Sequence, residues 1–316
     1  MTDRHLKAAQ RARIVPFSQA EGLGEVVCTF GVFDGFHRGH QFLIEQACAE
    51  AQRRGTAHIV VTFDRDPDEF FLPQERWRKL LTNAERLAYL ATAPVDAVLV
   101  LPFDEVLAMR EPADFLDHVF GSCCTPRAIF VGEDFRFGHR AIGTVDDLHT
   151  WGAGVGCDVS PQALLADDDT PVTATRVRNA LQAAQLEEAN HLLTRPYYVR
   201  AHVVPGRRVG HELGFPTANI VIEDSLVRPA DGVYAGYVFL DDLPCKAAIS
   251  IGVPATFMGV EATIEAHLID FEGALYGREV KVAFIEYLRP MYAFSSVEEL
   301  VQTVQSNIAY VRQLLV

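Results

Sequence analysis

The feature that most constrains the fold of this chain is an apolar run that ends abruptly at a glycine-rich turn. Val26–Phe30 has the composition of a buried strand, and the run stops at Gly31. Residues 41–52 then carry apolar side chains at helical spacing. A strand, a glycine turn and a helix N-terminus in this order predict a phosphate site, because glycine admits close backbone approach and the free N–H groups of the helix favour anions.

The turn reads GVFDGFHRGH from Gly31 to His40 and holds two histidines, three residues apart. It is neither the dinucleotide-binding GxGxxG motif nor a P-loop, since no Gly-Lys-Ser/Thr follows. His37 and His40 are therefore predicted to be the cationic partners of a polyphosphate. Two histidines beside a glycine turn also suit a solvated loop or a metal pair, and their spacing alone does not separate these alternatives.

Length and charge limit the classes of function. A chain of 316 residues predicts about two domains, each with its own core. The 28 Lys and Arg residues against 42 Asp and Glu residues give a net charge of −14, which is a poor match for nucleic acid. A nucleotide substrate remains compatible with this charge, because ATP brings Mg²⁺ to its own phosphates.

Cysteine usage and hydropathy predict a cytoplasmic location. The six cysteines are scattered and form no CxxC motif, which favours buried free thiols. No stretch reaches the roughly 18 apolar residues of a membrane span, and the N-terminus has no signal-peptide pattern. Neither a membrane nor a nucleic acid is expected as a partner, and the sequence predicts no particular oligomeric state.

Strand-like and helix-like segments alternate between Val26 and residue 131, whereas residues 1–24 look irregular. This alternation predicts an α/β doubly wound parallel sheet of Rossmann-like type, with ligands bound at the carboxyl ends of the strands. The expected strands are 26–30, 58–63, 97–103 and 128–131, and the expected helices are 41–54, 83–91 and 112–120.

The composition changes to β after a short amphipathic helix near 182–195. Short strands that alternate apolar with polar residues, followed by one amphipathic helix, predict a small β-barrel domain with a C-terminal helix. The expected strands are 198–204, 232–240, 245–251, 263–271 and 279–288, and the expected helix is 296–315.

The decapeptide GVFDGFHRGH resembles the GxFDGxHxGH signature of nucleotidyltransferases that attach AMP to a phosphate. The version in prokaryotic bifunctional riboflavin kinase/FAD synthetases is the most similar. The resemblance implies that His37 and His40 are catalytic. It also implies nucleotide binding by Gly31, Phe33, Asp34, Gly35 and Gly39.

Two later segments resemble motifs of the same family. GEDFRFG, from Gly132, is similar to the family's GxDFxFG segment, which implies flavin binding by Asp134, Phe135 and Phe137; two core phenylalanines at a strand end are the alternative. TPVTATRVRNAL, from Thr170, resembles SSTxIR at the start of a helix. It implies that Thr173 and Thr175 bind the nucleotide and that Arg178 is catalytic.

The C-terminal half resembles the riboflavin kinase module. GHELGFPTANI, from Gly210, carries the PTAN motif, a turn that in this family holds MgATP. The resemblance implies nucleotide binding by Gly210, Pro216, Thr217 and Asn219, with Thr217 and Asn219 as Mg²⁺ ligands. It further implies that Glu265 is the general base, and that Tyr234 and His267 bind flavin.

Five positions depart from the family's patterns. The chain reads DRDP where the family shows DPHP, and the acid at position 66 would repel polyphosphate unless Mg²⁺ lies between them. A hydroxyl of the SSTxIR segment is missing as well. The departures are Asp66, Ala174, Ala255, Met291 and Asn307.

The resemblance implies a bifunctional enzyme of flavin cofactor biosynthesis. Residues 1–184 would be an FMN adenylyltransferase domain and residues 185–316 a riboflavin kinase domain. The expected ligands are riboflavin, FMN, FAD and ATP, with Mg²⁺ as cofactor. Three alternatives stay open: retention of only one activity, a non-catalytic flavin- or nucleotide-binding protein, and adenylylation of a different phosphorylated acceptor, which the attached kinase-like barrel disfavours.

Overall fold

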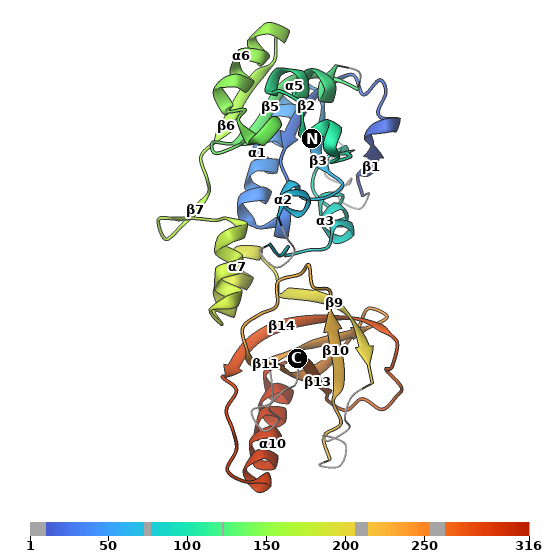
Figure 1. Ribbon diagram of the computed structural model, residues 1–316, viewed down its shortest axis with the longest axis vertical. Helices are drawn as coiled ribbons and strands as arrows, with labels where there is room; N and C mark the ends of the chain where they lie inside the picture. Colours follow the sequence, from blue (N-terminus) through green and yellow to red (C-terminus); the bar gives the residue numbers. More distant parts are fainter. Residues whose placement is uncertain (1–10, 73–76, 122, 206–213, 253–262, 316) are drawn as a thin grey trace, which may run out of the picture. The chain divides into compact units, whose positions relative to one another are not determined.

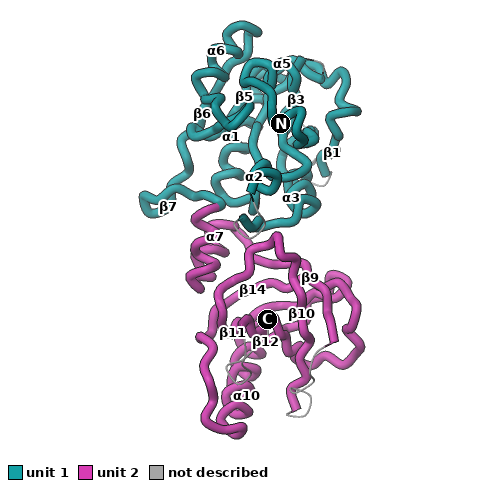
Figure 2. The backbone as a smooth tube through the Cα atoms, viewed as in Figure 1, with its two compact units in different colours: residues 1–174 teal, residues 175–316 magenta. Residues whose placement is uncertain are grey.

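The chain forms two compact units, residues 1–174 and 175–316 (Figure 2). The computed structural model describes residues 11–72, 77–121, 123–205, 214–252 and 263–315. The division falls at the start of helix α7 (Ala174–Gln182). The domain boundary expected at 184/185 stays a prediction.

Unit 1 is built on a six-stranded sheet in the order β1-β4-β3-β2-β5-β6, in which every neighbouring pair is parallel (Figure 1). This arrangement confirms the predicted doubly wound sheet. The strands are β1 (Arg13–Pro16), β2 (Glu25–Phe30), β3 (Ala57–Phe63), β4 (Ala97–Leu101), β5 (Thr125–Gly132) and β6 (Asp158–Gln162). The helices are α1 (Arg38–Arg54), α2 (Pro67–Phe71), α3 (Asn83–Leu90), α4 (Glu105–Ala108), α5 (Pro112–Phe120) and α6 (Val145–Val155).

The central strand β2 is buried on both faces after its first residue, as its mainly apolar composition predicts. Residues 26–30 are all fully buried. On one face Phe30 packs against Phe115 of α5, with ring centroids 5.9 Å apart. Helix α1 packs against β2, β3 and β5. The carboxyl end of β2 is therefore held rigidly at the middle of the sheet, where the glycine-rich turn begins.

The expectation that residues 1–24 are irregular is wrong for β1, and β6 was also not predicted. Both are edge strands. Residues 13–16 are mostly exposed, and Asp158–Gln162 is polar and contains a proline, which edge strands tolerate. Neither strand carries a hydrophobic pattern of its own, because each is defined by pairing with a buried neighbour, β4 or β5.

Unit 2 confirms the predicted barrel and its C-terminal helix. Six strands close in the order β10-β13-β12-β11-β14-β9, every neighbouring pair being antiparallel. They are β9 (Tyr197–Val204), β10 (Ala218–Ile222), β11 (Gly232–Leu240), β12 (Leu243–Gly252), β13 (Thr263–Leu268) and β14 (Glu279–Arg289). Helices α8 (Leu186–Leu193) and α10 (Val297–Leu314) belong to the same unit, and α10 packs against β12.

Strand β10 corrects one expectation about the PTAN motif. The motif was expected to form a turn, but Ala218 and Asn219 lie inside β10. Ala218 and Ile220 are buried in the barrel, whereas Asn219 between them is only half-buried. The strand's alternation therefore turns the asparagine side chain toward the outer surface.

Candidate active sites

The glycine-rich turn of unit 1 adopts an uncommon backbone. Phe33 and Phe36 have φ angles of 65° and 47°, in the left-handed region that few bulky residues occupy. Such conformations persist only where surrounding contacts enforce them. Phe33 is 1% exposed, and the carboxylate of Asp34 accepts hydrogen bonds from the backbone N–H groups of Leu80 (3.0 Å) and Leu81 (3.3 Å). Asp34 thus anchors the turn to a distant segment, and its predicted nucleotide contact stays a prediction.

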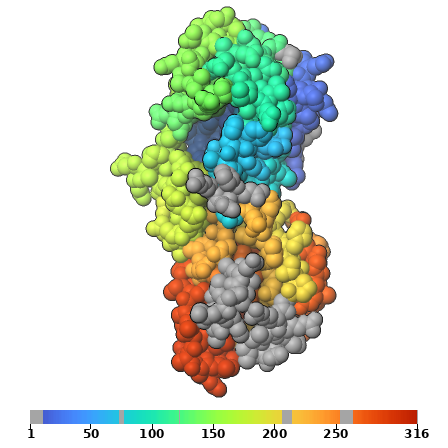
Figure 3. All heavy atoms as spheres, viewed as in Figure 1, coloured from blue at the N-terminus to red at the C-terminus, as the bar shows by residue number. Residues whose placement is uncertain are grey.

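Two glycines of the turn leave little space for a side chain. A Cβ atom at Gly39 would lie 3.0 Å from the carbonyl oxygen of Val172 and 3.2 Å from the ring of His37. A Cβ atom at Gly31 would lie 3.2 Å from the ring of Phe33. The first turn of α1 therefore packs directly against the backbone that precedes α7 along the chain. Figure 3 shows the blue surface of this part of unit 1 recessed between the cyan and green segments.

The two predicted catalytic histidines lie face to face. The rings of His37 and His40 are stacked, with centroids 3.6 Å apart, and His37 is the residue that immediately precedes α1. Burial, and then the nearby His37 and Arg86, lower the pKa of His40 well below its usual value. His40 is therefore neutral near pH 7 in this structure, and the expectation that both histidines are cations is wrong for it. A neutral imidazole still offers one N–H donor to an anion.

Arg86 on α3 is a charged residue of this region that sequence reasoning missed. The residue is 2% exposed, and its guanidinium donates to the carbonyl oxygens of Val32 (2.9 Å) and Phe63 (2.7 Å) and to the hydroxyl of Thr62 (2.8 Å). It thereby connects the turn after β2 to the carboxyl end of β3. A Thr-x-x-Glu-Arg run at a predicted helix start gives no signal that the arginine is buried.

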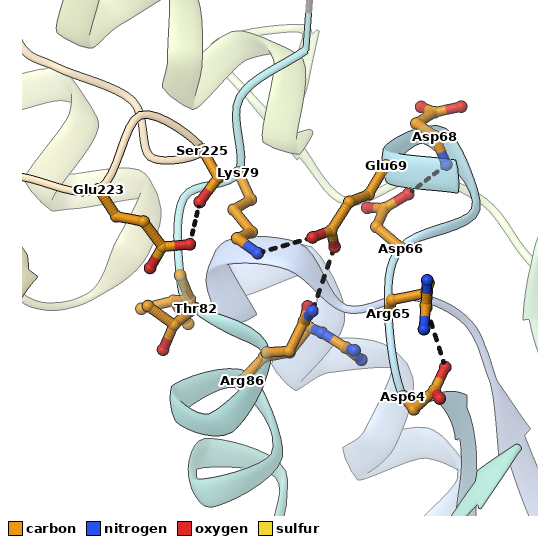
Figure 4. A network of polar contacts seen from close by, with 12 residues as sticks. Asp64, Arg65, Asp66, Asp68, Glu69, Lys79, Thr82, Arg86, Glu223 and Ser225 are labelled. Atoms are coloured by element: carbon orange, nitrogen blue, oxygen red, sulfur yellow. Dashed lines mark hydrogen bonds and ion pairs between the residues drawn. The ribbon is translucent and has the colours of Figure 1, made fainter. Parts of the chain in front are cut away.

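The acid at position 66 has a local structural role. Asp66 is buried and caps α2, its carboxylate accepting a hydrogen bond of 2.9 Å from the N–H of Asp68 (Figure 4). The negative charge of this carboxylate favours the protonated form of the nearby Arg86, against the effect of burial on the Arg86 pKa. The cap and the cation together explain how unit 1 accommodates an acid here.

A second buried cation lies in the same region. Lys79 pairs with Glu69 at 3.1 Å (Figure 4). The Asn83 side chain donates to the other oxygen of Glu69. Burial opposes ionisation of Glu69, but the hydrogen bonds from Asn83 and Lys79 prevail, so the pKa of Glu69 is lowered. The carboxyl edge of β3 therefore carries paired charges.

The aromatic residues predicted at the flavin end differ in exposure. Phe137 is 5% exposed and belongs to the hydrophobic core of unit 1, where its ring is stacked on Phe135 at 5.6 Å. Phe135 is half-buried, and Asp134 is exposed. Phe137 is consequently a core residue, as the alternative interpretation of this segment expected. The ring of Phe135 also packs on Phe30, with centroids 5.3 Å apart, and remains partly exposed. The contact of Phe135 and Asp134 with flavin stays a prediction.

The residues of the SSTxIR-like segment are divided between the units. Thr173 lies in unit 1, just before its last residue, Ala174, whereas Thr175 and Arg178 lie on α7 in unit 2. Within unit 2, Arg176 pairs with Glu188 of α8 at 2.8 Å. The convergence of Thr173, Thr175 and Arg178 with the histidines stays a prediction.

The barrel brings four predicted kinase residues together. Asn219 and Glu265 are directly opposite each other on β10 and β13, and the hydroxyl of Thr217 donates to Glu265 at 3.2 Å. Ser250, which was not predicted, is opposite Glu265 on its other side, on β12. Nδ1 of His267 lies 2.9 Å from the carbonyl oxygen of Pro216. A polar patch of Thr217, Asn219, Ser250, Glu265 and His267 thus lies on one face of the sheet.

Other predicted kinase residues are placed differently. Tyr234 is fully buried, and its hydroxyl donates to the carbonyl oxygen of Ala230 at 2.5 Å. Burial raises the pKa of this phenol. This geometry gives Tyr234 a structural role in the barrel, and its flavin contact stays a prediction. Gly210 and Ala255 lie outside the described residues.

The polar patch suits a hard divalent cation. Mg²⁺ prefers oxygen ligands and keeps several waters and substrate phosphates in its shell. The hydroxyl of Thr217 and the amide oxygen of Asn219 are such ligands, and the Glu265 carboxylate adds the only negative charge of the patch. Among the residues that the structure describes, no group of three or more His, Cys, Asp or Glu could hold a metal. A site of this kind would therefore depend on ATP for most of the negative charge.

Comparison with known proteins agrees with this division into two sites. Residues 19–176 match the family model for FAD synthetase, and residues 193–315 match the family model for riboflavin kinase. No helix among the described residues is both long and apolar enough to span a membrane.

Full-length relatives show the same combination. A bifunctional riboflavin kinase/FMN adenylyltransferase from Pseudomonas fluorescens is 35% identical over 91% of this chain and 92% of its own length. The protein of the same description from Escherichia coli K12 is 33% identical over 87% of this chain and 88% of its own. A crystal structure from Streptococcus pneumoniae described as a macrolide-efflux protein superimposes with a TM-score of 0.82 at 28% identity, covering 95% of this chain and 98% of that one. With both family models matched in order and relatives aligned over nearly the whole length, this chain belongs to the family of bifunctional riboflavin kinase/FMN adenylyltransferases.

Proposed function

We propose that the chain catalyses two successive steps of flavin cofactor synthesis. The barrel transfers the γ-phosphoryl group of ATP to riboflavin, which yields FMN and ADP. The parallel-sheet unit transfers AMP from a second ATP to the FMN phosphate, which yields FAD and pyrophosphate. The observation that carries this proposal is the match of an FAD synthetase model and a riboflavin kinase model to two separate units of one chain, each with its own cluster of polar residues.

In adenylyl transfer, an oxygen of the FMN phosphate attacks the α-phosphorus of ATP in line, and pyrophosphate leaves. No covalent enzyme intermediate is required. We assign to His37 and His40 hydrogen bonds to the phosphates, which suits the neutral state of His40. Gly31 and Gly39 keep the backbone open to the nucleotide, and Phe135 with Asp134 receives the flavin.

The SSTxIR-like segment completes this proposed site. Thr173, Thr175 and Arg178 add hydroxyl and guanidinium donors, whose place is to offset the negative charge that develops between the α- and β-phosphates. Arg178 has the catalytic role among them. Because Ala174 removes one hydroxyl, the remaining threonines carry more of this binding than in the family's usual pattern.

In riboflavin phosphorylation, Glu265 accepts the proton of the riboflavin 5′-hydroxyl as its oxygen attacks the γ-phosphorus. The Thr217 hydroxyl, 3.2 Å from Glu265, orients that carboxylate. Thr217 and Asn219 would hold Mg²⁺, which would neutralise phosphate charge when bound. Gly210 and Pro216 contribute to the nucleotide site, and His267 faces the flavin from the same strand as Glu265.

The test is chromatography of flavins after the purified protein has been incubated with riboflavin, ATP and Mg²⁺, and separately with FMN, ATP and Mg²⁺. FAD in both mixtures is the expected result. FMN alone from riboflavin, with no FAD from added FMN, would restrict the chain to the kinase activity. FAD from FMN only would restrict it to adenylylation, and no conversion would leave a binding protein. We also keep as proposals a cytoplasmic location and domains of residues 1–184 and 185–316.

A further inference from the structure

A short acidic hairpin of unit 1 reaches the first turn of α1 and has no role in the steps above. Strands β7 (Ala166–Asp167) and β8 (Thr170–Pro171) pair with each other and lie outside the main sheet (Figure 1). The two residues between them, Asp168 and Asp169, have φ angles of 49° and 59°. Positive φ at both central positions is the mark of a type I′ turn, in which aspartate is common. The hairpin therefore has a defined conformation.

Two contacts join this hairpin region to consecutive residues of α1. Nη1 of Arg38 lies 2.9 Å from Oδ1 of Asp167, and the two side chains are 29% and 22% exposed. At the next position, Gly39 lies so close to the carbonyl oxygen of Val172 that a Cβ atom would be 3.0 Å from it. One contact uses the first strand of the hairpin and the other uses the segment that follows the second strand.

The segment after the hairpin leads directly to Thr173. Val172 is 2% exposed, and its N–H donates to the carbonyl oxygen of Leu165 at 2.8 Å, which closes the base of the hairpin. Anything that holds the hairpin against α1 also holds Thr173 near the histidine-bearing turn. We propose that Arg38 and Asp167 are positioning residues for adenylyl transfer, and that their ion pair fixes Thr173 for the phosphates of a nucleoside triphosphate.

Charge supports the same inference, which rests on the adenylylation proposed for this unit. Three consecutive acids, Asp167 to Asp169, lie at the hairpin, in a chain of net charge −14. Acids beside a polyphosphate site repel the substrate unless a cation compensates them. Arg38 compensates the one acid of the three that faces α1. Loss of Arg38 is consequently expected to weaken ATP binding more than loss of Asp167.

The experiment compares Asp167→Asn, Arg38→Gln and Arg38→Lys with Asp168→Asn, which removes the same charge from the neighbouring turn residue. For FMN adenylylation, Asp167→Asn should raise the KM for ATP about three- to fivefold, as fits a partly exposed ion pair. Arg38→Gln should raise it further, and Arg38→Lys should remain near the wild-type value. Asp168→Asn should leave KM unchanged, and riboflavin phosphorylation should be the same in all four variants.

Hydrogen exchange supplies a readout that does not depend on turnover. Asp167→Asn and Arg38→Gln should accelerate exchange of the Val172 amide, and Asp168→Asn should not. If the wild-type protein made no FAD, the proposed function would fail while the exchange data still reported on the pair. Unchanged KM in Asp167→Asn and Arg38→Gln, with or without faster exchange, would overturn the positioning role. Equal effects in Asp168→Asn would overturn it too, because they would trace to net charge.

Discussion

The imidazole rings of His37 and His40 are stacked with their centroids 3.6 Å apart and their planes inclined by 20°. Two positive charges at this separation would repel each other strongly. Burial, together with His37 and Arg86, lowers the pKa of His40, so this ring is neutral near pH 7. The pair is therefore suited to hydrogen bonding of phosphate oxygens and cannot act as two fixed cations.

His40→Ala should reduce kcat/KM for FMN adenylylation about 100-fold, because it removes a donor aimed at developing charge. Riboflavin phosphorylation by the same preparation serves as the control and should be unchanged. Because its pKa is lowered well below the usual value, His40 should not change protonation between about pH 6 and 8, so the wild-type rate should show no break due to His40 in that range. Near-normal FAD formation by the variant would contradict the assignment of His40.

A buried histidine near the start of β3 should make unit 1 sensitive to acid. His58 is 2% exposed, its Nε2 lies 2.7 Å from the hydroxyl of Thr29, and burial lowers its pKa to about 4. The folded state thus binds fewer protons than the unfolded state between that value and about pH 6.5. The contribution of neutral His58 to the free energy of unfolding is complete above about pH 6.5. It is lost as the pH falls toward 4, and the total loss is about 3 kcal/mol.

His58→Gln should remove this part of the acid sensitivity while it keeps a partner for Thr29. The free energy of unfolding should fall by about 3 kcal/mol less in the variant than in the wild type between pH 7 and 4. Urea titrations followed by tryptophan fluorescence measure it, because both tryptophans, Trp77 and Trp151, lie in unit 1. His40 titrates in the same direction but is present in both proteins. Equal losses in the two proteins would show that His58 is not the cause.

Arg86→Lys should destabilise unit 1 although it keeps the charge. A lysine ammonium is a point donor and cannot reach the three acceptors, Val32, Thr62 and Phe63, that the planar guanidinium joins. Leaving buried carbonyl groups without donors should lower the free energy of unfolding by about 2 to 4 kcal/mol.

Arg65→Lys is the matched control for this change. The Arg65 side chain is 50% exposed and lies 3.9 Å from Asp64, so its replacement should cost less than about 0.5 kcal/mol. Urea unfolding followed by tryptophan fluorescence compares the two variants. If Arg86→Lys lowered the free energy of unfolding no more than Arg65→Lys does, the hydrogen bonds of Arg86 would not be what stabilises the contact between the turn and β3.

Glu265→Gln should reduce kcat for riboflavin phosphorylation at least about 100-fold, since an amide cannot accept the hydroxyl proton as a carboxylate does. Glutamine still offers an oxygen to the Thr217 hydroxyl, so the barrel should remain folded. Glu279→Gln, on the exposed side chain that pairs with Arg200, is the control and should retain full kinase activity. FMN adenylylation should be normal in both variants, and a kcat near wild type for Glu265→Gln would remove it from the role of base.

Local sequence patterns were sufficient for the central elements of both units. Residues 26–30 of strand β2 form an almost continuous apolar run because they are buried on both faces, and their burial follows from composition alone. The alternation within β9 likewise predicts a strand with one face in a barrel. The glycines, Asp34 and both histidines of the turn are identifiable because their types and spacing form a specific motif.

Edge strands and buried polar partners gave no such local pattern. Strand β1 exists because β4 offers an open edge, and Ser250 joins Glu265 only through the register of β12 on β13. Arg86 becomes buried and joins the turn to β3 by hydrogen bonds only once α3 packs beside the ends of β2 and β3. These features depend on contacts between residues far apart in the chain, which composition and spacing do not specify.

The sequence by itself therefore determined the two folds, the family and the residue types at each site, since hydrophobic periodicity and motif spacing are local properties of the chain. Only the tertiary structure decided the charge state of His40, the helix-capping role of Asp66 and the pairing of Arg38 with Asp167. The physical reason is that desolvation and electrostatic interaction depend on which distant groups surround a side chain, and folding alone brings those groups together.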